Sequence, residues 1–111
     1  MSKASHTLGD VLARLHATIE TRKGADPDAS YTALLLAGGV RKCAQKFGEE
    51  AIETVLAAVG GDKAHLTAEA ADALYHLMVT LAAAGVSPDD VAAELARRES
   101  QSGHAEKAGR K

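Results

Sequence analysis

Two acidic pairs of equal spacing lie at equal distances from one glycine, and this symmetry limits the fold more than any other feature. Glu50 and Glu53 precede Gly61 by 11 and 8 residues, and Glu69 and Asp72 follow it by 8 and 11 residues. Two helices that reverse direction at this glycine would bring the pairs level, and residues three apart on a helix share a face. The sequence therefore predicts an antiparallel helical hairpin that carries two pairs of carboxylates.

Helical periodicity extends over most of the chain, and no useful length of it alternates with the period of two that a strand requires. Residues suited to capping and to turns divide this pattern into segments. We expect N-caps at Thr7, Ser30 and Ser87, and breaks at Gly38-Gly39, Gly60-Gly61 and Gly85. The predicted helices cover about 8–23, 31–37, 40–59, 62–84 and 88–98.

Small side chains dominate the composition. Apolar residues make up 46% of the chain, and its only aromatic residues are Tyr31, Phe47 and Tyr75. Such a composition suits close-packed helices better than a β-sandwich. We expect an all-α fold with one domain over 1–111: a bundle of about five helices around the hairpin, its core at about 8–98, with a basic C-terminal tail at about 99–111. Because a chain of this length buries only a modest core, we also expect a homodimer.

Charge and cysteine usage exclude several classes of protein. The net charge of −2 does not indicate a nucleic-acid surface. Cys43 is the only cysteine, which excludes an internal disulfide and a multi-cysteine zinc site. We find no pattern of a signal peptide or of a membrane span. We expect a cytoplasmic protein without nucleic-acid or membrane partners.

The second acidic pair lies in a segment that is apolar on both flanks. Within 67–86 the only charged or titratable groups besides Tyr75 are Glu69, Asp72 and His76. Two carboxylates ~5 Å apart at an effective dielectric near 20 repel by about 3 kcal/mol, so they require a counter-charge. Oxygen ligands without a Cys or His cluster favour Mg²⁺, with Mn²⁺ as the alternative, and both ions typically accompany phosphate groups.

The first acidic pair is ambiguous when taken alone. An apolar stripe predicts the packed face of its helix, and the charged residues fall mostly on the other side, as on an ordinary solvated face. The stripe consists of Val40, Ala44, Phe47, Ala51, Val55 and Val59. For this helix the interpretation as surface charge stays open.

At these residues the sequence resembles the phosphoribosyl-ATP pyrophosphohydrolase family, within the all-α, MazG-like group of nucleotide pyrophosphohydrolases. The group's ExxE and ExxD segments are present as "EAIE" (50–53) and "EAAD" (69–72). The narrower resemblance is carried by "SYTALLLAGG", "RKCAQKFGEEAIE", "EAADALYHLMV", "GVSPDDVAAELARR" and "SGHAEKAGR", which follow one another in the family's order.

The resemblance implies hydrolysis of phosphoribosyl-ATP to phosphoribosyl-AMP and pyrophosphate, the second step of histidine biosynthesis. It implies that Glu50, Glu53, Glu69 and Asp72 bind Mg²⁺. Glu49 or Glu50 would orient the attacking water. The number of ions, the phosphorus attacked and the residue that stacks on the base stay open.

Further residues are candidates for binding substrate or its phosphates: Lys46, Ser30, Tyr31, Thr32, Lys107 and Arg110. Several of them have a simpler explanation as well. Capping accounts for Ser30, an ion pair along the helix accounts for Lys46, and a basic tail is usually solvated. For His76 we favour a hydrogen-bonded structural role, and for Cys43 packing alone.

Two other functions compete with this one. A house-cleaning nucleoside triphosphate pyrophosphohydrolase would use the same metal site on free nucleotides. A non-catalytic helical dimerisation module would carry its acids as surface charge.

Overall fold

In the computed structural model, residues 6–101 are described, and they form five helices and no strand. The helices are α1 (Leu8–Arg22), α2 (Tyr31–Ala37), α3 (Gly39–Gly60), α4 (Lys63–Ala83) and α5 (Pro88–Arg98). The all-α prediction is confirmed, and each predicted helix is present within a residue or two of its expected bounds.

Side-chain caps begin four of the helices. The hydroxyls of Thr7 and Ser30 accept hydrogen bonds from backbone amides three residues on, at 3.3 Å and 3.1 Å. Asp62 caps α4 in the same way. Ser87 and Asp90 form a reciprocal capping box at the start of α5. These caps satisfy amides that a helix start leaves without intrahelical partners, which fixes where each helix begins.

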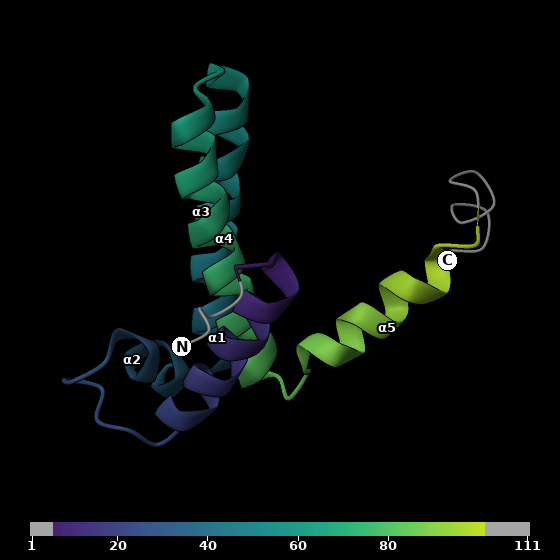
Figure 1. The fold of residues 1–111 in the computed structure, drawn as a ribbon. Coiled ribbons are helices and arrows are strands. Elements are labelled where there is room, and N and C mark those ends of the chain that lie inside the picture. Colours follow the sequence, from purple (N-terminus) through teal and green to yellow (C-terminus); the bar gives the residue numbers. More distant parts are fainter. Residues whose placement is uncertain (1–5, 102–111) are drawn as a thin grey trace, which may run out of the picture.

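The hairpin of α3 and α4 dominates the molecule. Figure 1 shows these two helices side by side over their length, and most contacts between elements are made between them. Gly61 makes the reversal with a φ of 82°, a left-handed conformation that favours glycine. The predicted antiparallel pairing is therefore confirmed.

The buried core lies where α1 and α2 meet the end of the hairpin remote from Gly61 (Figure 1). Its members are Ile19, Leu35, Cys43, Met78, Val79 and Ala82. Cys43 is fully packed, its thiol donates to the Leu35 carbonyl at 3.2 Å, and burial raises the pKa of that thiol. The packing role expected for Cys43 is therefore confirmed.

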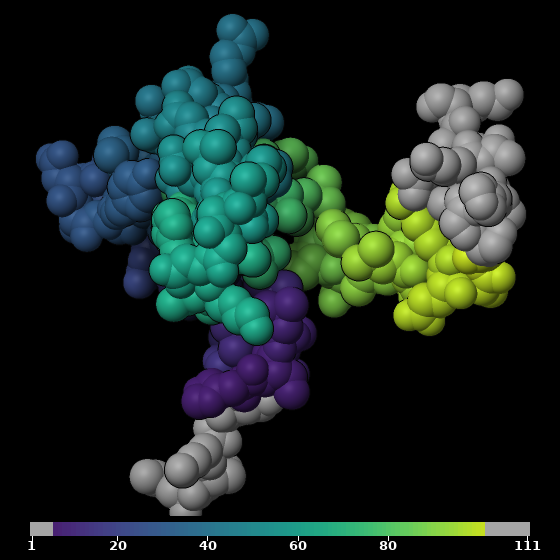
Figure 2. Space-filling model, turned by 90° about the horizontal axis from the view of Figure 1, so that it is seen from above, coloured from purple at the N-terminus to yellow at the C-terminus, as the bar shows by residue number. Residues whose placement is uncertain are grey.

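Among the described residues, the other end of the hairpin has little cover, and α5 contacts α1 but projects away from the bundle. Figures 1 and 2 show α5 as an arm that projects from the helices, and it buries none of its residues. The radius of gyration is 16.0 Å, against about 13 Å for a compact chain of this length. No single described helix is long and apolar enough to cross a membrane, and α4 and α5 reach that composition only as a pair bent by 108°.

The prediction that an apolar stripe packs along α3 is wrong for four of its residues, Val40, Ala44, Val55 and Val59, which are exposed. Val40, Val55 and Val59 are 45%, 60% and 83% exposed. Within residues 6–101, α3 makes most of its contacts with α4, which covers one side of it. The residues that face away from α4 therefore stay exposed within one chain.

The two glycines at the hairpin turn should respond oppositely to alanine. Gly60→Ala places a methyl group on a helical residue in open space, so we expect the free energy of unfolding to rise by about 0.5–1 kcal/mol. Gly61→Ala also meets open space but must adopt a positive φ, so we expect a loss of about 1–2 kcal/mol. Urea unfolding at a fixed protein concentration measures both changes. Equal shifts of the same sign would contradict the turn at Gly61.

Candidate active site

Carboxylates from both helices of the hairpin converge at its middle. One oxygen each from Glu50 on α3 and from Glu69 and Asp72 on α4 lie within 4.8 Å of one another. The first two residues are half-buried and Asp72 is exposed. The hairpin thus brings together three of the four acids that the sequence singled out.

Glu53 does not belong to this group among the residues that the structure describes. It follows Glu50 by three residues, which turns its side chain about 60° around α3, and it is exposed. Equal distances from Gly61 placed Glu53 level with Glu69, whereas Glu50 is the α3 acid that approaches both acids of α4. Glu53 stays a predicted ligand.

Thr54 holds the two helices together at the level of the carboxylates. Its hydroxyl lies 2.9 Å from the carbonyl oxygen of Glu50 and 3.0 Å from that of Glu69, so one proton serves acceptors on both helices. Sequence reasoning missed this residue. The hairpin register, which places position 54 level with the start of the second acidic pair, was the signal that could have found it.

The converging acids have few counter-charges of their own. Glu69 lies 3.5 Å from the largely exposed His65, and Glu50 and Asp72 make no ion pair within residues 6–101. Because like charges at this separation repel, the group favours binding a cation.

Glu49 belongs to a different set of contacts on the outside of α3. It accepts a hydrogen bond from Gln45 at 3.2 Å and pairs with Lys46 at 3.5 Å. The Gln45 hydrogen bond and then the Lys46 charge lower the pKa of this carboxyl, so Glu49 stays ionised at neutral pH. The ion pair along the helix that we expected as the simpler role of Lys46 is therefore present.

The segment that begins α2 packs against α4 one turn beyond Asp72. The hydroxyls of Thr32 and Tyr75 share a hydrogen bond. The ring of Tyr31 stacks on that of Tyr75, with the ring centroids 6.4 Å apart. It also meets the His76 ring edge-on, with the centroids 6.0 Å apart. Ser30 caps α2, as expected. The sequence did not predict this aromatic group, because Tyr31 precedes Tyr75 and His76 by 44 and 45 positions in the chain.

His76 is buried among these rings. Its Nδ1 has no hydrogen-bond partner among the residues that the structure describes, so the packed position is confirmed but the expected hydrogen bond is not found at that atom. The predicted phosphate contacts of Lys107 and Arg110 lie outside the described residues.

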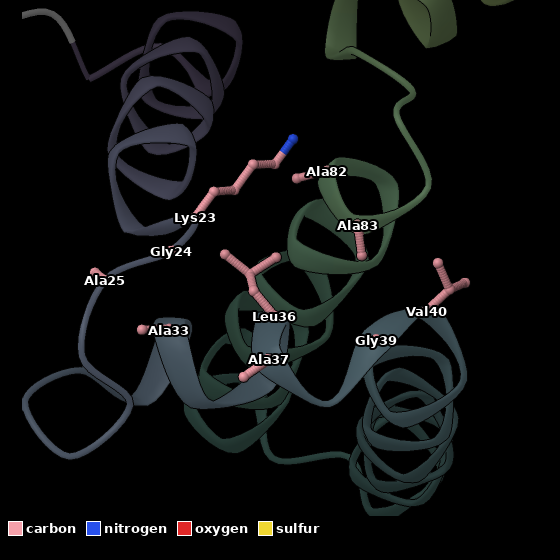
Figure 3. Close-up of a pocket in the computed structure, with 10 residues that line it drawn as sticks. All are labelled: Lys23, Gly24, Ala25, Ala33, Leu36, Ala37, Gly39, Val40, Ala82 and Ala83. Carbon is pink, nitrogen blue, oxygen red and sulfur yellow. The ribbon is translucent and has the colours of Figure 1, made fainter.

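A cavity of about 440 Å³ lies away from the carboxylates, between α2 and the end of α4. Figure 3 shows its small apolar lining, with the Lys23 side chain reaching across toward Ala82. Ala82 follows Asp72 by ten residues, about 15 Å along the helix. With no acid among its lining residues, this cavity is separate from the candidate active site.

A helical hairpin that gathers carboxylates from both of its helices, in an all-α chain, defines the MazG-like class of nucleotide pyrophosphohydrolases. Residues 12–99 match the family described as phosphoribosyl-ATP pyrophosphohydrolase, and the chain belongs to that family.

Three similar relatives carry the name phosphoribosyl-ATP pyrophosphatase. The protein from Cereibacter sphaeroides is 65% identical over 90% of this chain and 97% of its own length. That from Dinoroseobacter shibae is 65% identical over 90% of this chain and 98% of its own. That from Ruegeria pomeroyi is 64% identical over 90% of this chain and 95% of its own.

Removing one converging charge should stabilise the protein when no divalent cation is present. For Glu50→Gln in EDTA at low salt, we expect the free energy of unfolding to rise by about 1 kcal/mol, because repulsion from Glu69 and Asp72 is relieved. The matched control Glu53→Gln removes a glutamate outside the group and should change stability by less than about 0.5 kcal/mol. Urea unfolding measures both. A destabilised Glu50→Gln would show that no repulsion is stored there.

Proposed function

We propose that this chain hydrolyses phosphoribosyl-ATP to phosphoribosyl-AMP and pyrophosphate, in the second step of histidine biosynthesis. The observation that carries the proposal is the convergence of three carboxylates in a chain that belongs to this family. Relatives named for this activity match over nearly their whole length, which supports the same chemistry here. Because the substrate is an ATP derivative, we place the enzyme in the cytoplasm.

The donor set fits Mg²⁺. Glu50, Glu69 and Asp72 offer only oxygen atoms, and these lie within 4.8 Å of one another, close to the separations of about 3–4 Å that ligands on one Mg²⁺ adopt. We propose these three residues, with Glu53 beside them, as the ligands, and Mn²⁺ as the alternative ion. When bound, the ion would supply Lewis-acid stabilisation of charge on the phosphate oxygens.

In the reaction, a new P–O bond forms to water and one P–O bond of the α–β anhydride breaks, with pyrophosphate as the leaving group. Glu50 is our preferred residue for orienting this water, because it lies inside the carboxylate group. Glu49 lies outside the group and is engaged by Gln45 and Lys46. We assign Lys46 to the substrate phosphates, since it lies one turn from Glu50, and Glu49 to holding that lysine.

We further propose that 1–111 is one domain, with its helical core at about 8–98 and a basic tail at about 99–111. Lys107 and Arg110 of that tail would bind phosphate oxygens of the substrate. The five helices and the family match over 12–99 support the extent of the core.

The domain is proposed to act as a homodimer. Four apolar residues on the outer face of α3 are all at least 60% exposed, and α5 adds Val91 and Leu95, which are exposed within residues 6–101. The α3 residues are Ile52, Val55, Leu56 and Val59. Contiguous apolar surface of this kind marks an interface, and a second copy that packs its hairpin here would give the open molecule a complete core.

Pyrophosphate release from phosphoribosyl-ATP tests the reaction. We expect turnover with Mg²⁺ and none in EDTA. Glu50→Gln and Glu69→Gln should each lower kcat by about 100-fold or more, because charge stabilisation at the phosphates is lost. Glu49→Gln, which removes an exposed ion pair, should lower it by no more than about fivefold.

Several results would count against these assignments. A Glu49→Gln loss as large as that of Glu50→Gln would make Glu49 the water-orienting residue. Faster turnover of free nucleoside triphosphates than of phosphoribosyl-ATP would favour a house-cleaning enzyme. No turnover of either, with no shift of the melting temperature by Mg²⁺, would favour the non-catalytic module.

Light scattering tests the dimer. The wild-type chain should have twice its 11.5 kDa mass, and Leu56→Glu should reduce it to the mass of one chain, because a charge cannot be buried in the interface. Leu8→Glu is the matched control: Leu8 and Leu56 are 61% and 60% exposed, but Leu8 lies on α1. A monomeric wild type, or equal effects of the two substitutions, would contradict this interface.

A further inference from the structure

A second cavity lies between α2 and the first half of α3, beside the carboxylates. Its volume is about 690 Å³, which falls within the range of about 300–1,000 Å³ that small-molecule sites occupy. Tyr31 and Leu34 belong to its mostly apolar lining, and Lys42 and Lys46 add positive charge. This combination suits a ligand with a flat apolar body and an anionic group.

Residues on both helices of the hairpin connect the cavity to the carboxylate group. Lys46 lines it and precedes Glu50 by four residues, a rise of about 6 Å on α3. Tyr31 lines it as well and stacks on Tyr75, which follows Asp72 by three residues on α4. A ligand held at the carboxylates can therefore extend into the cavity.

Tyr31 is held as a platform for an aromatic ring. Its ring lies nearly parallel to that of Tyr75, with an interplanar angle of 20°, while 52% of the residue stays exposed. The stack and the edge contact with His76 fix its orientation. Stacking on a preoriented ring is how proteins commonly bind nucleobases, at little cost in side-chain entropy.

Lys42 adds a positive charge at the cavity, and this charge also helps to lower the pKa of Glu49. Lys42 makes no ion pair within the described part of the chain. A Cβ atom on Gly38 would lie 2.8 Å from Cγ and 2.9 Å from Cβ of Lys42, so the missing side chain at Gly38 is what allows the lysine stem to lie there. Gly38 and Lys42 both line the cavity, so the close packing of the lysine stem on Gly38 places Lys42 along the cavity edge.

We propose that this cavity binds the purine and the phosphoribosyl arm of the substrate, an inference that rests on the proposed function. Tyr31 stacks on the purine, and Lys42 binds the phosphate of the phosphoribosyl arm. Lys42 precedes Glu50 by eight residues, about 12 Å along α3, a span suited to a purine that carries a phosphorylated sugar on each side. Because ATP has no second phosphorylated arm, Lys42 is the residue that distinguishes phosphoribosyl-ATP from ATP.

Steady-state kinetics and product binding test this assignment together. Lys42→Gln should raise KM for phosphoribosyl-ATP about tenfold and leave kcat within about twofold, because a charged hydrogen bond away from the reacting bond is lost. Gly38→Ala should act in the same direction by displacing the lysine. Calorimetry should show about tenfold weaker binding of phosphoribosyl-AMP to Lys42→Gln, with binding of AMP unchanged. Tyr31→Ala should weaken binding of phosphoribosyl-AMP and of AMP, because both carry the purine, and Tyr31→Phe should weaken binding of neither.

Lys23→Gln, which removes a lysine from the separate cavity of Figure 3, is the control and should leave every value unchanged. If the wild type turns over phosphoribosyl-ATP but Lys42→Gln and Tyr31→Ala keep its KM, the cavity is not the subsite and the proposed function stands. If the wild type has no turnover but binds phosphoribosyl-AMP with the expected losses in both variants, the proposed function fails and the subsite stands. If Lys42→Gln weakens the binding of AMP as much as that of phosphoribosyl-AMP, Lys42 binds the phosphate that both ligands share. The assignment of Lys42 to the phosphoribosyl arm is then overturned.

Discussion

The packing of α3 against α4 is the constraint on which the rest of the structure depends, because it forces like charges together. Three carboxylate oxygens lie within 4.8 Å, although repulsion at that distance opposes folding. Two features resist it. The Thr54 hydroxyl joins the backbones of both helices at the level of the acids, and the buried core anchors the hairpin at the end remote from its turn. Packing elsewhere in the protein thus holds the three carboxylates together, and a bound cation would relieve the repulsion between them.

Much of this arrangement could be predicted from the sequence, since local signals determine it. Caps at Thr7, Ser30 and Ser87 mark helix starts, and Gly61 marks the reversal. Register was predicted less well. Equal distances from the turn paired Glu53 with Glu69, but side-chain direction and interhelical packing bring Glu50 to both acids of α4. A register argument locates such a site to within one helical turn and cannot select the residue within that turn.

Periodicity could not reveal which apolar faces one chain covers. Val55 and Val59 belong to the same stripe as Phe47 and Ala51, yet only the latter two are partly buried. An apolar face looks the same in sequence whether it packs within its own chain or against another molecule. Contacts between distant segments were equally hidden. The stack of Tyr31 on Tyr75 depends on the path of α2 across the hairpin, which no local pattern encodes.

The apolar surface and the acidic surface of α3 lie on different sides of the helix, so they can serve different purposes. At about 100° per residue, Ile52 points nearly opposite to Glu50 and Leu56 points about 120° away from it, while Lys46 and Lys42 fall on the flank between the acids and solvent. A partner that covers the outer face therefore leaves the carboxylates and the α2 cavity open to substrate. Dimerisation and catalysis can then be separated by mutation. Their remaining connection is mechanical, since covering the exposed half of α3 would hold the helix against the repulsion at Glu50.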